Sequence, residues 1–303
     1  TLMLIDGIPA YGSVSLEHFL DIIPIPAIKQ IEIIRGPGST LYGTNAFSAV
    51  INIITKDKKD HRDCLYGKIG SYQTKELGLY TSSNIKDLHF SFSGQFTDND
   101  GYNKTAIDER GLKGKINYEK DFENLYAKIQ FKNLNLSAGY SHEEFGRFGP
   151  VPLFTFGNQF HKDQGRYYIK RHFINLSFNH NITDKMNILM NFHYDYIVKE
   201  SYAGTMTQDL MVNLFHLVDS TETPDYIKFD GHSFLGELQF SYMINSKLSL
   251  ISGLTGETRK INSLGGHFSD LSGDELFSGS TKELPFNIED YAFAANNLTS
   301  LTL

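Results

Sequence analysis

Apolar and polar side chains alternate along most of the chain. Phe90 and Phe92, for example, stand on either side of Ser91 in a stretch that keeps this period of two from residue 88 to 97. Because successive side chains of a strand point to opposite faces, the pattern predicts strands with one apolar face and one polar face. The same period recurs in three further segments, 134–141, 186–196 and 234–242.

The connections between these strands fall into two length classes. Short turns on one side and long loops on the other are typical of outer-membrane β-barrels, in which the long loops are extracellular. A soluble β-sandwich shares the alternation but has no reason to sort its connections by length. Tight turns are predicted at 84–87, 132–133, 181–185, 244–247 and 296–297, and long loops at 98–123, 142–166, 197–231 and 259–287.

About eleven strands follow from this pattern, rising from the periplasmic side and descending to it in turn. The strand-like segment 112–118 does not fit this order of rising and descending strands, so we expect it to be a hairpin inside an extracellular loop or an extension of the next strand. The predicted strands are 64–71, 74–84, 87–97, 124–131, 134–141, 167–179, 186–198, 232–242, 248–258, 287–295 and a last, rising one that begins at 299–303. The predicted lipid-facing set includes Phe90, Phe92, Leu136, Ile188, Met190, Leu238 and Phe240.

The composition fits such alternation. The 303 residues are 40% hydrophobic, with 17 Tyr, 23 Phe and no Trp, and the formal net charge is −7. No run approaches the roughly 18 apolar residues of a membrane-spanning helix. The acidity argues against nucleic acid as a partner, and a single cysteine, Cys64, excludes an internal disulfide. Without Trp, the rings at the membrane interfaces must be Tyr and Phe, for which Tyr126, Tyr194, Tyr196 and Tyr242 are candidates.

The most distinctive segment lies near the start of the chain. A β-branched strand around Ile31–Ile34 leads into a glycine-rich turn, Ser39 can cap a short helix through Tyr42, and a second strand spans Val50–Ile54. Gly38 and Gly43 have the spacing of a phosphate-binding loop, but Thr44 stands where that loop needs a lysine, which argues against it.

This segment resembles the plug domain of TonB-dependent outer-membrane receptors. The resemblance rests on Ile-Glu-Ile-Ile-Arg-Gly-Pro-Gly-Ser-Thr-Leu-Tyr-Gly at 31–43, on Val-Ile-Asn-Ile-Ile-Thr at 50–55, and on Leu4-Ile5-Asp6-Gly7-Ile8-Pro9, which matches a plug strand and turn. The plug motif residues are Gly36, Pro37, Gly38, Ser39, Tyr42 and Gly43.

The resemblance implies an all-β transmembrane fold: part of an α+β plug, followed by the first half of a 22-stranded antiparallel barrel. We expect the plug part at 1–57, a charged linker at 58–63 and barrel strands at 64–303. Because the chain begins inside a strand, we expect it to be truncated, with the segment that contacts TonB and the later barrel strands outside it.

The function implied by the resemblance is uptake of a scarce ligand across the bacterial outer membrane, driven by the TonB complex and without catalysis. A ferric siderophore is the first candidate ligand, and cobalamin, haem or an oligosaccharide are alternatives. A passive porin or adhesin barrel would leave the plug motif unexplained, and a secreted β-rich enzyme would be soluble. The expected partners are TonB, a ferric chelate and outer-membrane lipid, with no cofactor and no metal site.

Two sets of residues are candidates for this function. In the resembling family the arginine of the plug motif, here Arg35, pairs with glutamates of the inner wall, for which alternation offers Glu237 and Glu257. Those glutamates could instead line a wet channel. For the ligand we expect a plug loop and an aromatic extracellular loop, although the rings could instead pack that loop over the barrel mouth. The predicted ligand-binding residues are Tyr11, Gly12, Ser13, Phe145, Arg147, Phe148, Phe154, Phe156 and Arg166.

Overall fold

The structure is a computed structural model. It describes residues 2–10, 22–36, 46–60, 62–107, 113–146, 166–201, 222–246, 248–270, 282–283 and 298–302. Within these ranges, no helix has the length and apolar character needed to cross a membrane.

The first described residues form a small four-stranded sheet. Its strand order is β2-β1-β4-β3, with β1 parallel to β4 and the other pairs antiparallel. Asp6 and Gly7 form the tight turn between β1 and β2 with φ of 49° and 84°, a left-handed geometry that Asp tolerates and Gly favours. The elements are β1 (Leu2–Ile5), β2 (Ile8–Pro9), the short 3-10 helix η2 (Ile25–Ala27), β3 (Ile28–Arg35) and β4 (Ala49–Thr55).

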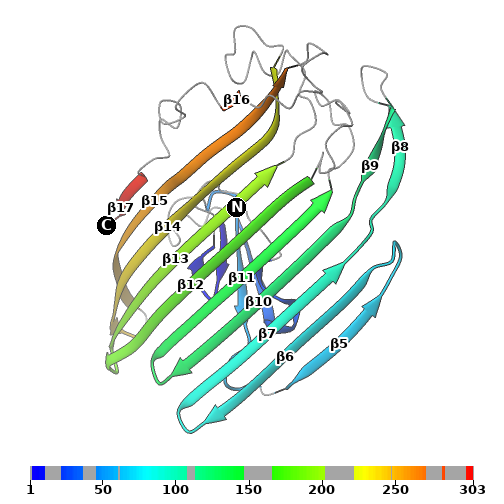
Figure 1. Cartoon of the computed structure of the whole chain (residues 1–303). Helices are drawn as coiled ribbons and strands as arrows, with labels where there is room; N and C mark the ends of the chain where they lie inside the picture. The colour runs from blue at the N-terminus through cyan, green and yellow to red at the C-terminus, as the bar shows by residue number, and fades with distance from the viewer. Residues whose placement is uncertain are drawn as a thin grey trace.

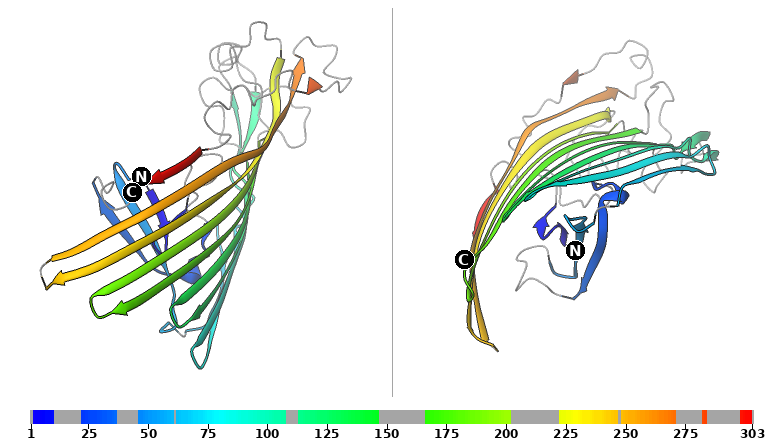
Figure 2. Two further views of the ribbon diagram at one scale, coloured as in Figure 1. Left: turned by 90° about the vertical axis from the view of Figure 1, so that its left-hand side faces the viewer. Right: turned by 90° about the horizontal axis from the view of Figure 1, so that it is seen from below.

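A second, much larger sheet curves around the first. Its eleven strands are all paired antiparallel, in the order β16-β15-β14-β13-β12-β11-β10-β7-β6-β5 with β17 also on β15. Figures 1 and 2 show the small sheet on the concave side of this open wall. The strands are β5 (Cys64–Ile69), β6 (Lys75–Ile85), β7 (Leu88–Asp98), β10 (Lys120–Phe131), β11 (Leu134–Gly146), β12 (Arg166–Thr183), β13 (Met186–Ser201), β14 (Glu222–Asn245), β15 (Leu248–Asp270), β16 (Lys282–Glu283) and β17 (Leu298–Thr302).

The predicted tight turns after residues 85, 131, 183 and 245 are confirmed, but several strands are longer than predicted. Strand β14 begins at Glu222 rather than 232, and β15 continues to Asp270 rather than 258. These two strands remain paired along almost their whole length, from Glu222 opposite Asp270 to Asn245 opposite Leu248. A backbone hydrogen-bond ladder does not need an apolar face, so it continues where the alternation stops.

Two further expectations are decided by strand pairing. Strands β8 (Asn103–Ile107) and β9 (Lys113–Asn117) pair only with each other, which confirms the hairpin alternative for the segment around 112–118. Strand β17 pairs antiparallel with β15, with Thr302 opposite Thr255, so it descends. A strand at the predicted place, 299–303, is therefore confirmed, but it descends where the count of strands requires a rising one. The predicted descending strand at 287–295 lies outside the described residues.

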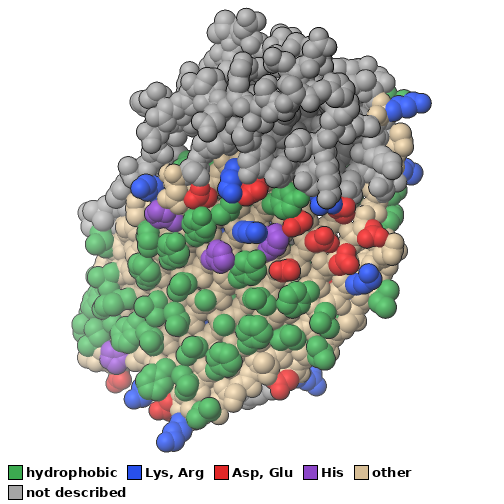
Figure 3. Space-filling view, in the orientation of Figure 1, with side chains coloured by type: hydrophobic (Ala, Val, Ile, Leu, Met, Phe, Trp, Pro, Cys, Tyr) green, Lys and Arg blue, Asp and Glu red, His purple; other side chains and the backbone are tan. Residues whose placement is uncertain are grey.

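The two faces of the wall differ as the alternation predicts. Phe90, Leu136, Met190 and Leu238 are exposed on the convex face, where Phe92, Ile188 and Phe240 are half-buried. Figure 3 shows hydrophobic side chains over the middle and lower part of this face and charged ones above and below them. The polar residues of the other face are buried toward the small sheet, among them His89, Ser91, Ser93, Gln95, Asn124 and Asn175.

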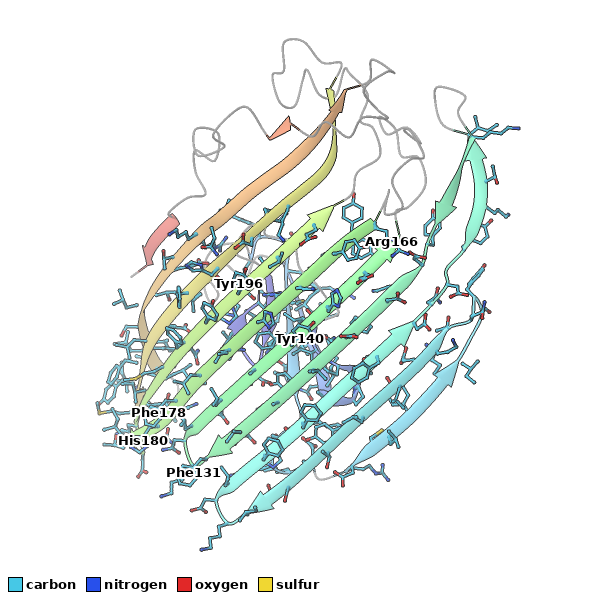
Figure 4. All side chains as sticks on the ribbon, viewed as in Figure 1. Phe131, Tyr140, Arg166, Phe178, His180 and Tyr196 are labelled. Carbon is cyan, nitrogen blue, oxygen red and sulfur yellow. The ribbon has the colours of Figure 1, made fainter. Side chains whose placement is uncertain are left out.

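Aromatic side chains mark two levels of the convex face. Tyr140, His172 and Tyr196 follow one another across β11, β12 and β13, with ring centroids 5.0 and 6.3 Å apart. Phe131 and Phe178 lie near the tight turns, well below Tyr140 and Tyr196 (Figure 4). Such belts are typical of the two membrane interfaces. Tyr126, predicted to belong to a belt, is instead 2% exposed and faces the small sheet, because it shares the inward side of β10 with Asn124 and Lys128.

Candidate functional site

A buried polar cluster joins the small sheet to the wall. The Lys128 ammonium on β10 donates to Asp6 Oδ2 and to Thr55 Oγ1, both at 2.8 Å. Thr55 Oγ1 also donates to Asp6 Oδ2 at 2.6 Å and lies 3.3 Å from the hydroxyl oxygen of Tyr126. Lys128 and Thr55 are 6% and 1% exposed, whereas the Asp6 side chain is 26% exposed, so the Lys128–Asp6 ion pair is buried on the side of the lysine and open to solvent on the side of the carboxylate.

The local backbone explains why Asp6 can reach Lys128. The left-handed turn at Asp6 and Gly7 is fixed from β4, since the Thr55 amide donates to Asp6 Oδ1 at 2.8 Å and the Gly7 amide donates to Asn52 Oδ1 at 3.0 Å. One carboxylate therefore ties together the end of β1, the end of β4 and the wall.

Apolar packing surrounds this cluster. Met3, Ile5 and Ile53 of the small sheet belong to the same buried core as Tyr126 and Phe173 of the wall. A neutral hydrogen bond from the Ile25 amide to Gln95 Oε1, 2.9 Å long, adds a contact with β7. The small sheet therefore lies against the inner side of β7, β10 and β12.

The segment between β4 and β5 is held by a second ion cluster. Lys29 Nζ lies 2.9 Å from Asp57 Oδ2 and 3.0 Å from Asp60 Oδ2, and these hydrogen bonds raise the pKa of Lys29. Partial burial acts to raise the pKa of Asp57 and of Asp60. Backbone hydrogen bonds and the Lys29 ammonium outweigh that effect and hold both values below the ordinary range. We call this cluster the Lys29 clasp.

Farther along the wall, two arginine–carboxylate pairs line the inner face. Arg171 and Asp195 form an ion pair with side chains only 1% and 0% exposed, and no hydrogen-bond partner for Arg171 Nη1 or Nη2 is found among the described residues. Arg259 Nε lies 2.5 Å from Glu257 Oε1. The inner wall is thus polar and charged even where it is buried.

The predicted plug–barrel pair is placed differently. Glu237 and Glu257 do lie on the inner side of β14 and β15, but Glu257 is paired with Arg259, and Glu237 accepts a hydrogen bond from Asn191 Nδ2 at 2.8 Å. Arg35 is exposed at the end of β3, and among the described residues no carboxylate lies within ion-pair distance of it. The contact between Arg35 and the glutamates therefore stays a prediction.

Few of the predicted ligand residues are described. Phe145 lies on β11 rather than in a loop, and its ring stacks on Tyr167 of β12 at 5.2 Å with an interplanar angle of 8°. Arg166 begins β12 and forms an ion pair with Glu119 (Figure 4 labels Arg166). In the plug motif, Gly36 has a φ of 100° that suits glycine. The remaining predicted residues lie outside the described ranges: Tyr11, Gly12, Ser13, Pro37, Gly38, Ser39, Tyr42, Gly43, Arg147, Phe148, Phe154 and Phe156.

Sequence reasoning missed Lys128 and Asp6, which form an ion pair between the wall and the small sheet. Lys128 points inward from β10 together with Asn124 and Tyr126. From the sequence alone it cannot be told apart from any polar side chain that lines a water-filled lumen. Its acidic partner, Asp6, stood in a segment noted only for its turn. Within the described part of the chain, no group of three or more metal-ligating side chains is present.

Comparison with known proteins supports this architecture. Residues 1–50 match the family model of the TonB-dependent receptor plug domain. Two solved structures share the fold over most of the chain. The pyoverdine receptor FpvA of Pseudomonas aeruginosa has a TM-score of 0.61 and 15% identity, covering 88% of this chain and 40% of that one. The ferric enterobactin receptor PfeA has a TM-score of 0.64 and 14% identity, covering 86% and 42%.

Curated relatives are similar over a shorter stretch. The vitamin B12 transporter BtuB of Vibrio vulnificus is 31% identical over 131 residues, 42% of this chain and 20% of the transporter. The iron-regulated outer membrane virulence protein of Vibrio cholerae is 33% identical over 135 residues, 40% of this chain and 19% of that protein. The match thus spans about a fifth of the length of these relatives. Residues 1–50 thus carry the sequence of a TonB-dependent receptor plug domain, and the wall around them has the fold of the barrels of such outer-membrane receptors.

Proposed function

We propose that this protein takes up a ferric chelate across the outer membrane, with energy supplied through TonB. The observation that carries the proposal is the small sheet, here the plug, fastened to the polar inner face of the wall through Lys128, Asp6 and Thr55. A pore that relied on diffusion would have no use for a folded domain in its lumen. A transporter that must hold and then release its cargo requires such a domain.

The proposed ligand site lies at the extracellular end of the wall, above the plug. By alternation with the buried residues Glu143 and Ile169, the stacked rings of Phe145 and Tyr167 belong to the inner face there. Flat aromatic area suits a rigid organic chelate, and Arg147, the residue that follows β11 in the chain, is proposed to add charge for an anionic one. Tyr11, Gly12 and Ser13 of the plug segment are proposed to contribute to the same site.

Cobalamin is the second candidate ligand. A relative named as a vitamin B12 transporter matches 42% of the chain, and corrinoids also offer a large flat ring system. Cobalamin carries no strong negative charge, so it would not need Arg147.

Equilibrium titration of the complete receptor distinguishes these ligands. We expect a ferric triscatecholate or trishydroxamate chelate to bind more tightly than cyanocobalamin or a maltooligosaccharide. Phe145→Ala should weaken chelate binding about tenfold, in line with the roughly 1–3 kcal/mol that an aromatic stack contributes. Phe131→Ala, on the convex face at a tight turn, is the matched control and should have no effect. Tighter binding of cyanocobalamin than of either chelate would overturn the proposed ligand.

A further inference from the structure

We propose that Lys128 is the latch of the plug: the residue that holds the plug in its closed position and must lose its partners before a passage opens beside the plug. The inference rests on the proposed function only in that transport gives the latch its purpose. Its test needs no ligand and no TonB.

A single side chain of the wall holds two plug elements at once. Lys128 Nζ bonds Asp6 in the β1–β2 turn and Thr55 at the end of β4, each at 2.8 Å. These two elements are neighbours in the plug sheet, because β1 and β4 pair in parallel with Ile5 opposite Ile53. Holding their common end therefore holds the centre of the sheet.

Lys128 also lies on a firmly paired part of the wall. It lies inside β10, three residues before the strand ends at Phe131, opposite Ser91 of β7 on one side and Ser137 of β11 on the other. Both neighbouring strands pair with β10 over ten or more positions, so the lysine cannot follow a moving plug. Motion of the plug must break its contacts with Lys128.

The Lys128–Asp6 contact differs from the other contacts between plug and wall in its charge and its burial. Two other hydrogen bonds to the wall, from the Ile25 amide to Gln95 and from the Lys58 amide to Gln130, are neutral and can be exchanged for water. The Asp63 carboxylate accepts from the Ser82 amide, and the Lys56 ammonium lies 4.2 Å from the centroid of the Tyr80 ring, but neither contact joins two opposite charges. The Lys128 side chain is 7% exposed, and withdrawing Asp6 would leave a buried ammonium without a counter-charge. The ion pair therefore favours two discrete positions of the plug. In the closed position the pair is formed, and in the open position both charged groups are hydrated.

The water-facing side of the pair makes opening possible. The Asp6 side chain is 26% exposed, so solvent can reach the carboxylate as it leaves the ammonium. A pair buried on both sides would resist separation much more strongly.

The test uses the complete receptor in lipid nanodiscs and compares amide hydrogen exchange in Leu2–Ile5 and Ala49–Thr55 with exchange in β11 to β13. In Lys128→Met and in Asp6→Asn, plug exchange should rise at least tenfold while wall exchange stays unchanged. Lys132→Met is the matched control, since this lysine is exposed at the turn after β10, and its plug exchange should equal that of the wild type.

Two further measurements keep the result decisive. The double variant Lys128→Met/Asp6→Asn should exchange no faster than Lys128→Met alone, because both changes remove the same link. Lys128→Gln, which keeps a donor without the charge, should lie between wild type and Lys128→Met. Unchanged plug exchange in Lys128→Met, a rise in the wall strands of equal size, or additive effects in the double variant would each overturn the latch.

Discussion

At the scale of single residues, the inner wall contains charges that are buried as deeply as a protein core. Asp195 is 0% exposed and Arg171 is 1% exposed, and the two are paired with each other. Such pairs contribute little net stability, because desolvation offsets their attraction, but breaking one by removing a single partner is costly.

For this pair we predict that Arg171→Met lowers the free energy of unfolding of the complete receptor by about 3–5 kcal/mol, because Asp195 loses its counter-charge. Arg171→Met/Asp195→Leu, which removes both charges, should recover most of that loss. Chemical unfolding in lipid vesicles measures both values. A double variant as unstable as the single one would contradict this account of the pair.

Residue-scale contacts were also the least predictable from the sequence. Alternation correctly placed Glu237 and Glu257 on the inner face, yet it could not identify their partners, since Arg259 and Asn191 become neighbours only through strand register. Lys128 and Asp6 are 122 positions apart in the chain, and nothing local in either segment indicates the other.

At the scale of elements, the Lys29 clasp predicts how the linker responds to pH. Because the pKa values of Asp57 and Asp60 are lowered, their contribution is present above the ordinary value of 3.8 and is lost as the pH falls below it. Because the pKa of Lys29 is raised, its contribution is present below 10.5 and is lost as the pH rises above that value. The clasp should therefore be closed across the neutral range.

Cys64, exposed at the start of β5, is a labelling site for this prediction. A nitroxide there, with any other cysteine of the receptor replaced by serine, should be restrained at pH 7 and more mobile as the pH falls below about 4. In Lys29→Met it should be mobile at both pH values, whereas in Lys58→Met, an exposed control on the linker, it should behave as in the wild type. A label equally restrained at both pH values would show that the clasp does not hold the linker.

Strand identity was predictable where one face meets lipid, and strand length was not. The pattern of Phe90, Ser91 and Phe92 identified β7 to within a residue at each end. The alternation predicted for β14 covers 234–242, whereas the β14–β15 ladder continues as far as Glu222 opposite Asp270, because backbone hydrogen bonds do not need an apolar face. The plug strands were found because their β-branched runs are interrupted by glycine turns with fixed geometry.

At the scale of the whole molecule, the convex face is predicted to be in contact with lipid. Phe92 lies midway along β7 on that face, so Phe92→Arg should lower stability by about 2–4 kcal/mol in a bilayer. Ile107→Arg on the β8–β9 hairpin, where the isoleucine is 61% exposed, is the control and should change stability little. Equal folding free energies for wild type and Phe92→Arg in vesicles would mean that this face does not meet the hydrocarbon.

In the function that we propose, the plug, the latch and the polar inner wall serve a receptor that uses energy to move its cargo. Uptake of a radioiron-labelled chelate, in a strain that lacks the receptor and carries the complete gene on a plasmid, tests this claim most directly. We predict accumulation that requires the receptor and stops when an uncoupler collapses the proton-motive force. Accumulation that requires the receptor but continues at the same rate with the uncoupler would identify a passive channel and contradict the account.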